Sequence, residues 1–234
     1  MANILVIDVG SHKAEEVMLF EGNPSWSLRN KLRMLRRHKF SGLRQITNIN
    51  RRSKEFASNH EFRYVLIEPI MHRELLDFVA RKSSLLIGGV SSCGDSGPID
   101  LLMAADSLGH SLIPSKPNLS GRKMPVYNLN FIALYEFLVE TFIASGDCGG
   151  VVVRMNAEGV EGPIVDYLSQ HANPKPLALA GSLGDIKKCF GEQAYDSAMR
   201  TLNDAEIPFI YLTSHPRSWS SGLEQLEKVL MGRS

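Results

Sequence analysis

The residues most suited to chemistry follow the first apolar stretch of the chain. Ile4 to Ile7 are apolar, and Asp8, Val9 and Gly10 come directly after them. A short continuous apolar run is typical of a strand buried on both faces of a parallel sheet. Ligands of such sheets bind beyond the carboxyl ends of the strands, where Asp8 could accept hydrogen bonds from a ligand. Gly10 has no Cβ, so backbone and ligand could approach each other closely there.

A second acidic residue, Glu68, follows the apolar run Tyr64 to Ile67. An acid after the second strand commonly hydrogen-bonds ribose hydroxyls in nucleotide-binding α/β folds. The dinucleotide fingerprint GxGxxG is absent, because His12 and Lys13 stand where further glycines would be needed. The pattern therefore favours a nucleoside over a pyrophosphate ligand. The simpler alternative is that Asp8 caps a helix and Glu68 is a surface acid.

Two further loops carry polar groups after expected strands. The stretch from Met155 to Gly162, MNAEGVEG, offers an amide at Asn156 and two acids three residues apart, Glu158 and Glu161. It could equally be an ordinary strand-to-helix loop, with its acids favoured by the helix dipole. The stretch SSCGD, which begins at Ser91, could contact a base or simply turn the chain.

The elements that must position these residues alternate between short strands and helices. We expect strands at 4–7, 64–67, 85–90, 151–155, 177–180 and 209–212, and helices at 15–20, 28–38, 73–81, 130–144, 163–170, 185–205 and 222–230. Pro114, Pro117, Gly121 and Pro125 favour a loop over 98–126. The alternation predicts one Rossmann-like α/β domain over residues 1–234, a doubly wound, mostly parallel sheet with a basic helical insertion at about 25–60.

Several of these stretches, taken in order, resemble the FkbM family of S-adenosylmethionine-dependent methyltransferases. They are IDVGSHKAEE, IEP, GGVSSCGDSG, MPVYNL, VVVRMNAEGVEG and GSLGDIKKCFGE followed by IPFIYL, and they span residues 4–212. That family typically has a DVGAxxGxx-like first loop, an acid-Pro pair after strand two and a (D/N)xEGxE motif after strand four. The resemblance implies a class I methyltransferase-like fold.

The resemblance also implies roles for individual residues. Asp8, Gly10, Ser11 and His12 would line the methionine side of S-adenosylmethionine. Glu68, with Pro69 after it, would hold the ribose, and Ser91 would lie near the adenine. Asn156 would orient the acceptor, Glu158 would act as the base, and Glu161 would face the substrate end. The expected reaction is methyl transfer to a hydroxyl of a sugar or polyketide-like acceptor, a small molecule or glycan.

Two other functions stay open. In a catalytically degenerate methyltransferase-like scaffold or binding module, Ala14 in place of a second glycine and Asn156 in place of the commoner aspartate would reflect lost chemistry. The stretch ILVIDVGSHKAEEVMLFEG also resembles the first phosphate loop of actin-like sugar kinases. That alternative requires EEVMLF to be a strand and a second DxG motif near mid-chain.

Composition narrows the class of protein. The chain has 234 residues, of which 44% are apolar and 22% charged, as is ordinary for a soluble globular protein. Three cysteines without CxxC spacing, and histidines without HExxH spacing, predict reduced thiols and no metal site. No signal peptide is expected, and the apolar stretch 131–144 contains two glutamates and is too short to span a bilayer. We therefore expect a cytoplasmic protein.

A cationic segment lies on an otherwise acidic chain. Between Ser25 and Lys54 there is no acid, and the basic residues are Arg29, Lys31, Arg33, Arg36, Arg37, Lys39, Arg44, Arg51, Arg52 and Lys54. The segment could be a helix with solvated charges, a basic amphipathic surface for anionic lipid, or a site for phosphate in a nucleic acid or sugar nucleotide. We expect Arg29 to Lys54 to contact a phosphate-bearing or lipid partner, which would place the protein at the membrane periphery. A homo-oligomer is compatible with the sequence.

Overall fold

A six-stranded parallel sheet forms the centre of the computed structural model, which describes residues 3–24, 31, 34, 40–82, 84–104, 110–116, 118–157, 159–213 and 215–232. Its strands, in spatial order, are β3 (Ser84–Ile87), β2 (Phe62–Ile67), β1 (Asn3–Val9), β7 (Cys148–Met155), β8 (Ala178–Gly181) and β9 (Phe209–Tyr211). Every neighbouring pair is parallel. From β1 the chain adds β2 and β3 on one side, and β7, β8 and β9 follow on the other side. The order of the strands therefore reverses between β1 and β7, as in doubly wound nucleotide-binding sheets.

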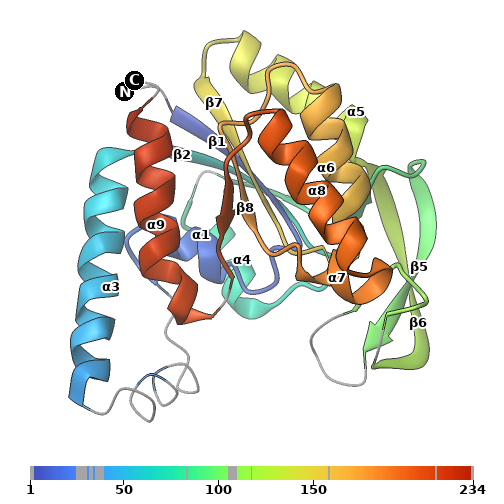
Figure 1. Ribbon diagram of the computed structural model, residues 1–234, viewed down its shortest axis with the longest axis horizontal. Coiled ribbons are helices and arrows are strands. Elements are labelled where there is room, and N and C mark those ends of the chain that lie inside the picture. Colours follow the sequence, from blue (N-terminus) through green and yellow to red (C-terminus); the bar gives the residue numbers. More distant parts are fainter. Residues whose placement is uncertain are drawn as a thin grey trace.

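Helices cover both faces of this sheet (Figure 1). One face packs against α1 (Glu15–Phe20), α3 (Phe40–Asn59), α4 (Arg73–Val79) and α9 (Pro216–Met231). The other packs against α5 (Phe131–Leu138) with its π-helical continuation η1 (Val139–Ala144), α6 (Glu161–Gln170), α7 (Gly184–Phe190) and α8 (Glu192–Asp204). The predicted Rossmann-like α/β fold is confirmed.

The first strand shows why its apolar run is continuous. Ile4 and Val6 point into the core beneath α1, α3, α4 and α9, whereas Leu5 and Ile7 point into the core beneath α5 to α8. Because successive side chains alternate between two buried faces, both sets must be apolar. Asp8 continues the first set, so its carboxylate faces α1 and is fully buried.

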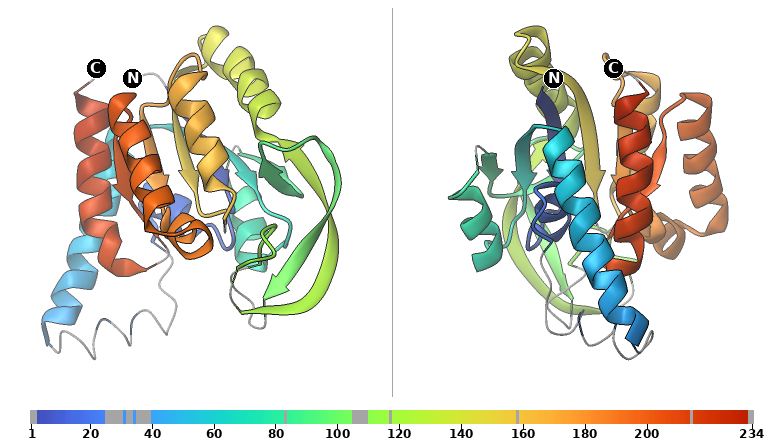
Figure 2. Two further views of the ribbon diagram at one scale, coloured as in Figure 1. Left: turned by 45° about the vertical axis from the view of Figure 1, so that its right-hand side comes forward. Right: turned by 90° about the vertical axis from the view of Figure 1, so that its left-hand side faces the viewer.

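A second sheet interrupts the expected pattern, and the loop predicted over 98–126 is wrong. Strands β4 (Val90–Ser92), β5 (Gly97–Ala104) and β6 (Leu119–Asn130) form a three-stranded sheet in the order β4-β6-β5 beside the main one (Figure 2). Pro125 is tolerated in β6 because β4 pairs with β6 only from Asn128 onward, which leaves one edge of β6 free at the proline.

The strand predicted at 85–90 is two strands in different sheets. A Cβ on Gly89 would lie 2.6 Å from the carbonyl oxygen of Tyr127, so β6 approaches the chain closely between β3 and β4. The helix predicted at 185–205 is also divided, into α7 and α8, by Gly191 at φ +88°. The last helix begins at Pro216, earlier than expected, after His215 as its N-cap. The helix predicted at 28–38 falls almost wholly outside the described residues.

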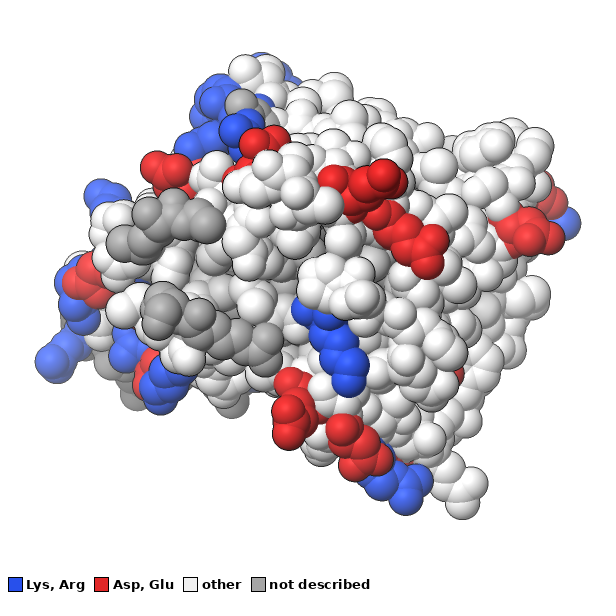
Figure 3. Space-filling view, turned by 90° about the horizontal axis from the view of Figure 1, so that it is seen from above, with Lys and Arg blue, Asp and Glu red and all other residues white. Residues whose placement is uncertain are grey.

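The described half of the cationic segment lies on and near α3, which runs beside α9 (Figure 1). Lys31, Arg44, Arg51 and Lys54 are exposed. On the face shown in Figure 3, most of the Lys and Arg surface lies on the side of the molecule that carries α3 and α9. Arg51 pairs with Glu55 (Nη1 to Oε1, 2.7 Å), and Arg52 pairs with Glu224 of α9 (Nη1 to Oε2, 2.9 Å). The other five cations are outside the described residues.

Within the described part of the chain, no helix has both the length and the apolar character that crossing a bilayer requires.

Candidate functional site

Three loops meet at the carboxyl ends of β1, β2 and β7. The amide of Gly10 donates to the carbonyl of Ile67 at the end of β2 (3.0 Å), and the amide of Asn156 donates to the carbonyl of Val9 (3.0 Å). The loops after the three strands are therefore joined by backbone hydrogen bonds. They lie where the strand order reverses, which is where ligands bind in open α/β sheets.

The loop after β1 takes left-handed backbone conformations at three positions. Gly10, His12 and Ala14 have φ of +79°, +46° and +60°. A Cβ on Gly10 would lie 2.4 Å from the carbonyl oxygen of Asn156, so the glycine permits close packing of the chain's own loops. Ala14 keeps the left-handed conformation that a glycine adopts most easily.

Glu68 fastens the first loop to the second. It is 7% exposed, and its Oε2 accepts a hydrogen bond from the amide of His12 (2.7 Å) while Oε1 accepts from the amide of Ile70 (3.0 Å). Burial raises the pKa of Glu68, and the two amide hydrogen bonds oppose that rise. Because each carboxylate oxygen can accept a second hydrogen bond, Glu68 could still bind two ribose hydroxyls.

A fully buried cluster of charges lies beneath the first loop. Arg154 of β7 is directly opposite Asp8 of β1 in the sheet register, and its Nη1 lies 2.8 Å from Oδ1 of Asp8. Its Nη2 lies 2.7 Å from Oε1 of Glu16 on α1, and Nη1 also donates to the carbonyl of Gly10 (2.7 Å). All three residues are at most 1% exposed. Oδ1 of Asp8 therefore pairs with Arg154, and the ligand contact expected for Asp8 stays a prediction.

The sequence contains one signal for this cluster. Arg154 is a lone cation inside the apolar run VVVRM, and a buried arginine needs an acidic partner. Burial alone would lower the pKa of Arg154, but Asp8 and Glu16 raise it overall. Burial raises the pKa of Glu16 to about 7, against the opposing effect of Arg154.

Two histidines face each other at the mouth of the first loop. The rings of His12 and His72 are edge to face, with centroids 4.5 Å apart, and Nδ1 of His12 lies 3.3 Å from Oε2 of Glu15. Burial lowers the pKa of His72, and the nearby His12 and Lys13 lower it further. The Nε2 atoms of both rings are buried with no hydrogen-bond partner among the described residues.

The loop after β7 is organised by Glu161, the first residue of α6. Its Oε1 accepts from the amide of Ala157 (2.9 Å) and its Oε2 from the amide of Gly159 (2.7 Å). Glu161 is fully buried, which raises its pKa to about 7. The side chain of Asn156 is half-buried at the start of the loop, and Glu158 lies outside the described residues.

A buried lysine that the sequence did not single out lies near this loop. Lys116 is 8% exposed, and burial lowers its pKa while Asp185 opposes that effect. Its segment packs onto the loop, since a Cβ on Gly159 would lie 2.8 Å from Cγ1 of Ile113. Lys116 falls in the range 98–126 that the sequence predicts as a loop, where a lysine is expected to be exposed.

Most of the expected site residues lie together, but Ser91 does not. Asp8, Gly10, Ser11, His12, Glu68, Pro69 and Asn156 all lie in or directly before the three joined loops. Ser11 is fully buried and its hydroxyl donates to the carbonyl of Asp8 (3.0 Å). Ser91 lies in the second sheet, where its hydroxyl donates to the carbonyl of Leu129 (3.0 Å).

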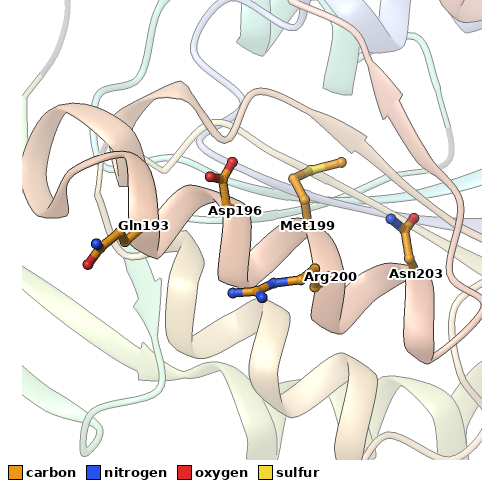
Figure 4. Close-up of a pocket in the computed structure, with 5 residues that line it drawn as sticks. All are labelled: Gln193, Asp196, Met199, Arg200 and Asn203. Atoms are coloured by element: carbon orange, nitrogen blue, oxygen red, sulfur yellow. The ribbon is translucent and has the colours of Figure 1, made fainter.

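Two cavities of the molecule lie away from these loops. One of about 480 Å³ is lined by residues on one face of α8 (Figure 4), namely Gln193, Asp196, Met199, Arg200 and Asn203. Another of about 440 Å³ lies at the amino ends of β1 and β2, with Asn3 and Phe62 in its wall. Neither cavity contains a residue that the sequence assigned to the site.

No protein-family model matches the chain, and no curated protein matches it.

Proposed function

We propose that the chain is an S-adenosylmethionine-dependent methyltransferase that methylates a hydroxyl oxygen of a sugar or polyketide-like acceptor. The observation that carries the proposal is Glu68, an acid after β2 that is fastened to the glycine loop after β1 at the switch point of the sheet. This arrangement suits a nucleoside, because the carboxylate of Glu68 can accept hydrogen bonds from ribose hydroxyls. The glycine-rich loop that binds a pyrophosphate is absent from the sequence after β1.

The surrounding residues are chemically compatible with a cationic nucleoside cofactor. The cluster of Asp8, Glu16 and Arg154 has two acids for one cation, and Oδ2 of Asp8 is buried without a hydrogen-bond partner among the described residues. A net negative charge in a buried region attracts a cation more strongly than it would in water. When bound, S-adenosylmethionine supplies an electrophilic methyl group on a positively charged sulfur.

The residues of the chain would contribute mainly alignment. Glu68 would hold the ribose, the loop from Gly10 to His12 would bind the methionine side, and Asn156 would orient the acceptor hydroxyl. Holding acceptor and donor in line removes much of the entropic barrier to the displacement. A base would take up the hydroxyl proton, and we assign that role to Glu158.

Binding measurements test this proposal directly. In calorimetry on folded protein, S-adenosylmethionine should bind and NAD should not. Glu68→Gln should weaken S-adenosylmethionine binding by about tenfold or more, because a hydrogen bond to a charged group is worth about 1.5–3 kcal/mol. Glu74→Gln is the matched control, since Glu74 lies on α4 near the same loops but is exposed and pairs with Lys13. No binding of S-adenosylmethionine, or equal losses in both variants, would refute the proposal.

One observation favours a degenerate binding module as the second candidate. Asp8 is bound to Arg154, and Asn156 has no group that can act as a base. Cofactor binding without methyl transfer to any of a panel of glycans and hydroxylated small molecules would support this candidate. The kinase alternative is not proposed, because EEVMLF, which it requires as a strand, forms helix α1.

We also propose a cytoplasmic location, with the cationic segment bringing the protein to phosphate groups of an anionic lipid or of a phosphate-bearing substrate or carrier. The exposed cations of α3 support this proposal.

A further inference from the structure

The buried cluster beneath the first loop carries an unbalanced charge. Arg154 lies between the carboxylates of Asp8 (2.8 Å) and Glu16 (2.7 Å), so one guanidinium faces two acids. None of these residues is more than 1% exposed. In such surroundings an unpaired charge is costly, and a proton or another cation would reduce that cost.

The proton can be held by Glu16. The charged groups that act on it are Asp8 from β1, Arg154 from β7 and Glu15 from its own helix. Burial contributes most to the raised pKa of about 7, Arg154 opposes it, and the two acids add to it. Near neutral pH, Glu16 is therefore partly protonated, and its protonation responds to any charge that arrives nearby.

The cluster is linked to the loop that the proposed function assigns to the methionine side of the cofactor. Nη1 of Arg154 donates to the carbonyl of Gly10 in that loop (2.7 Å), and Glu16 lies on α1, which begins directly after the loop. All of these groups lie at the carboxyl ends of β1 and β7, where the strand order reverses. A cation bound at this edge would interact with Glu16 through a region of low dielectric.

We propose that Glu16 is a specificity-determining residue, which distinguishes S-adenosylmethionine from S-adenosylhomocysteine by losing its proton when the positively charged cofactor binds. The inference rests on the proposed function. The O–H bond of the Glu16 carboxyl group breaks, the proton passes to the solvent, and the carboxylate keeps the electron pair. After methyl transfer the positive charge on sulfur is gone, Glu16 regains a proton, and the product is held less tightly.

Calorimetry in buffers of different ionisation enthalpy measures the released proton. If cofactor binding lowers the pKa of Glu16 by about one unit, then S-adenosylmethionine binding at pH 7 releases about 0.4 proton, and its affinity rises about fivefold between pH 6 and pH 8. S-adenosylhomocysteine should release less than about 0.1 proton, because it lacks the sulfonium charge. The wild-type protein alone gives this result, so the test does not depend on the folding of a variant.

Two variants assign the proton to its residue. Glu16→Gln should abolish the difference in proton release between the two ligands. Glu15→Gln removes the neighbouring acid of the same helix and should leave S-adenosylmethionine releasing more proton than S-adenosylhomocysteine, although the release is smaller because Glu15 helps to raise the pKa of Glu16. The amino and carboxyl groups of the ligand titrate equally in all three proteins, so the difference between proteins isolates Glu16.

Three results would overturn the inference. Equal proton release for both ligands would show that the sulfonium charge is not sensed. Undiminished release in Glu16→Gln would place the proton on another group. If neither ligand binds folded protein, the proposed function fails together with the inference, whereas binding without differential proton release refutes the inference alone.

Discussion

Glu68 and Glu161 make the same kind of hydrogen bonds but connect different parts of the chain. Each is a buried acid whose two carboxylate oxygens each accept a backbone N–H. Glu68 joins loops that follow different strands, and its donors His12 and Ile70 are half-buried. Glu161 closes its own loop onto the start of α6, is fully buried, and one of its donors, Gly159, is buried as well. The comparison indicates that Glu68 lies nearer the surface and joins separate loops, whereas Glu161 fixes the shape of a single loop.

A substitution that forces apart the loops after β1 and β7 should destabilise the protein more than any other change that we predict. In Gly10→Ala the new Cβ would lie 2.4 Å from the carbonyl oxygen of Asn156, at a φ of +79°. Overpacking and left-handed strain together should reduce the free energy of unfolding by about 4 kcal/mol. Urea denaturation measures the loss. Gly162→Ala is the control, because a Cβ there meets no atom within 4 Å and no strain is expected. Equal losses in both variants would contradict the close contact of the loops after β1 and β7.

The second prediction concerns the pH dependence of stability. The pKa of Glu161 is about 7 in the folded protein and 4.5 in its reference state, so folding takes up a proton between these values. The stabilisation from this proton is complete below about pH 4.5 and is lost as the pH rises through 7, with a total of about 3 kcal/mol. Denaturation at pH 5 and pH 8 measures it. In Glu161→Gln the change should shrink and leave the share due to Glu16. An undiminished change would show that Glu161 is not the buried titrating group.

Truncation of the two acids should separate their roles. Glu161→Ala leaves the buried amide of Gly159 without an acceptor and should cost about 2 kcal/mol at pH 6. Glu68→Ala should cost less than about 1 kcal/mol, because water can reach the half-buried amides of His12 and Ile70. Urea denaturation of both variants, with ligand binding measured on the same samples, tests the contrast. A larger stability loss in Glu68→Ala would reverse the assignment.

The fold could be predicted from the sequence because its elements carry strong local patterns. Continuous apolar runs identified β1, β2 and β7, since both faces of these strands are buried. The second sheet could not be predicted in the same way. Much of β6 is exposed, so it has no apolar pattern, and Pro125 within it is typical of a loop. Such strands form because distant segments of the chain pair with each other, and local sequence patterns do not indicate that pairing.

The candidate site could be predicted only in part, for a related reason. Residue types and strand ends placed Gly10, Glu68 and Asn156 at one edge of the sheet. The partner of Asp8 depends on the register between β1 and β7, which brings Arg154 opposite it across 146 residues of chain. Likewise, Glu68 and Glu161 are both acids near turns in the sequence. Only the positions of their amide donors distinguish them.

The cationic surface of α3 is exposed to solvent, whereas Glu68 and Glu161 are buried. Single substitutions on this surface should therefore cause the smallest free-energy changes that we predict. Arg44 and Lys54 are exposed and have no ion-pair partner within the part of the chain that the structure describes, whereas Arg51 is paired with Glu55. In sedimentation with vesicles rich in phosphatidylserine, Arg44→Gln and Lys54→Gln should each weaken binding by about 1 kcal/mol, or about fivefold, at low salt. The double variant Arg51→Gln with Glu55→Gln is the matched control and should weaken it less, because removing the ion pair leaves the net charge of the surface unchanged. Salt at about 0.5 M should remove these differences, since exposed charges are screened. Equal effects of all three changes, or binding that persists unchanged in high salt, would show that these cations do not contact the lipid phosphate.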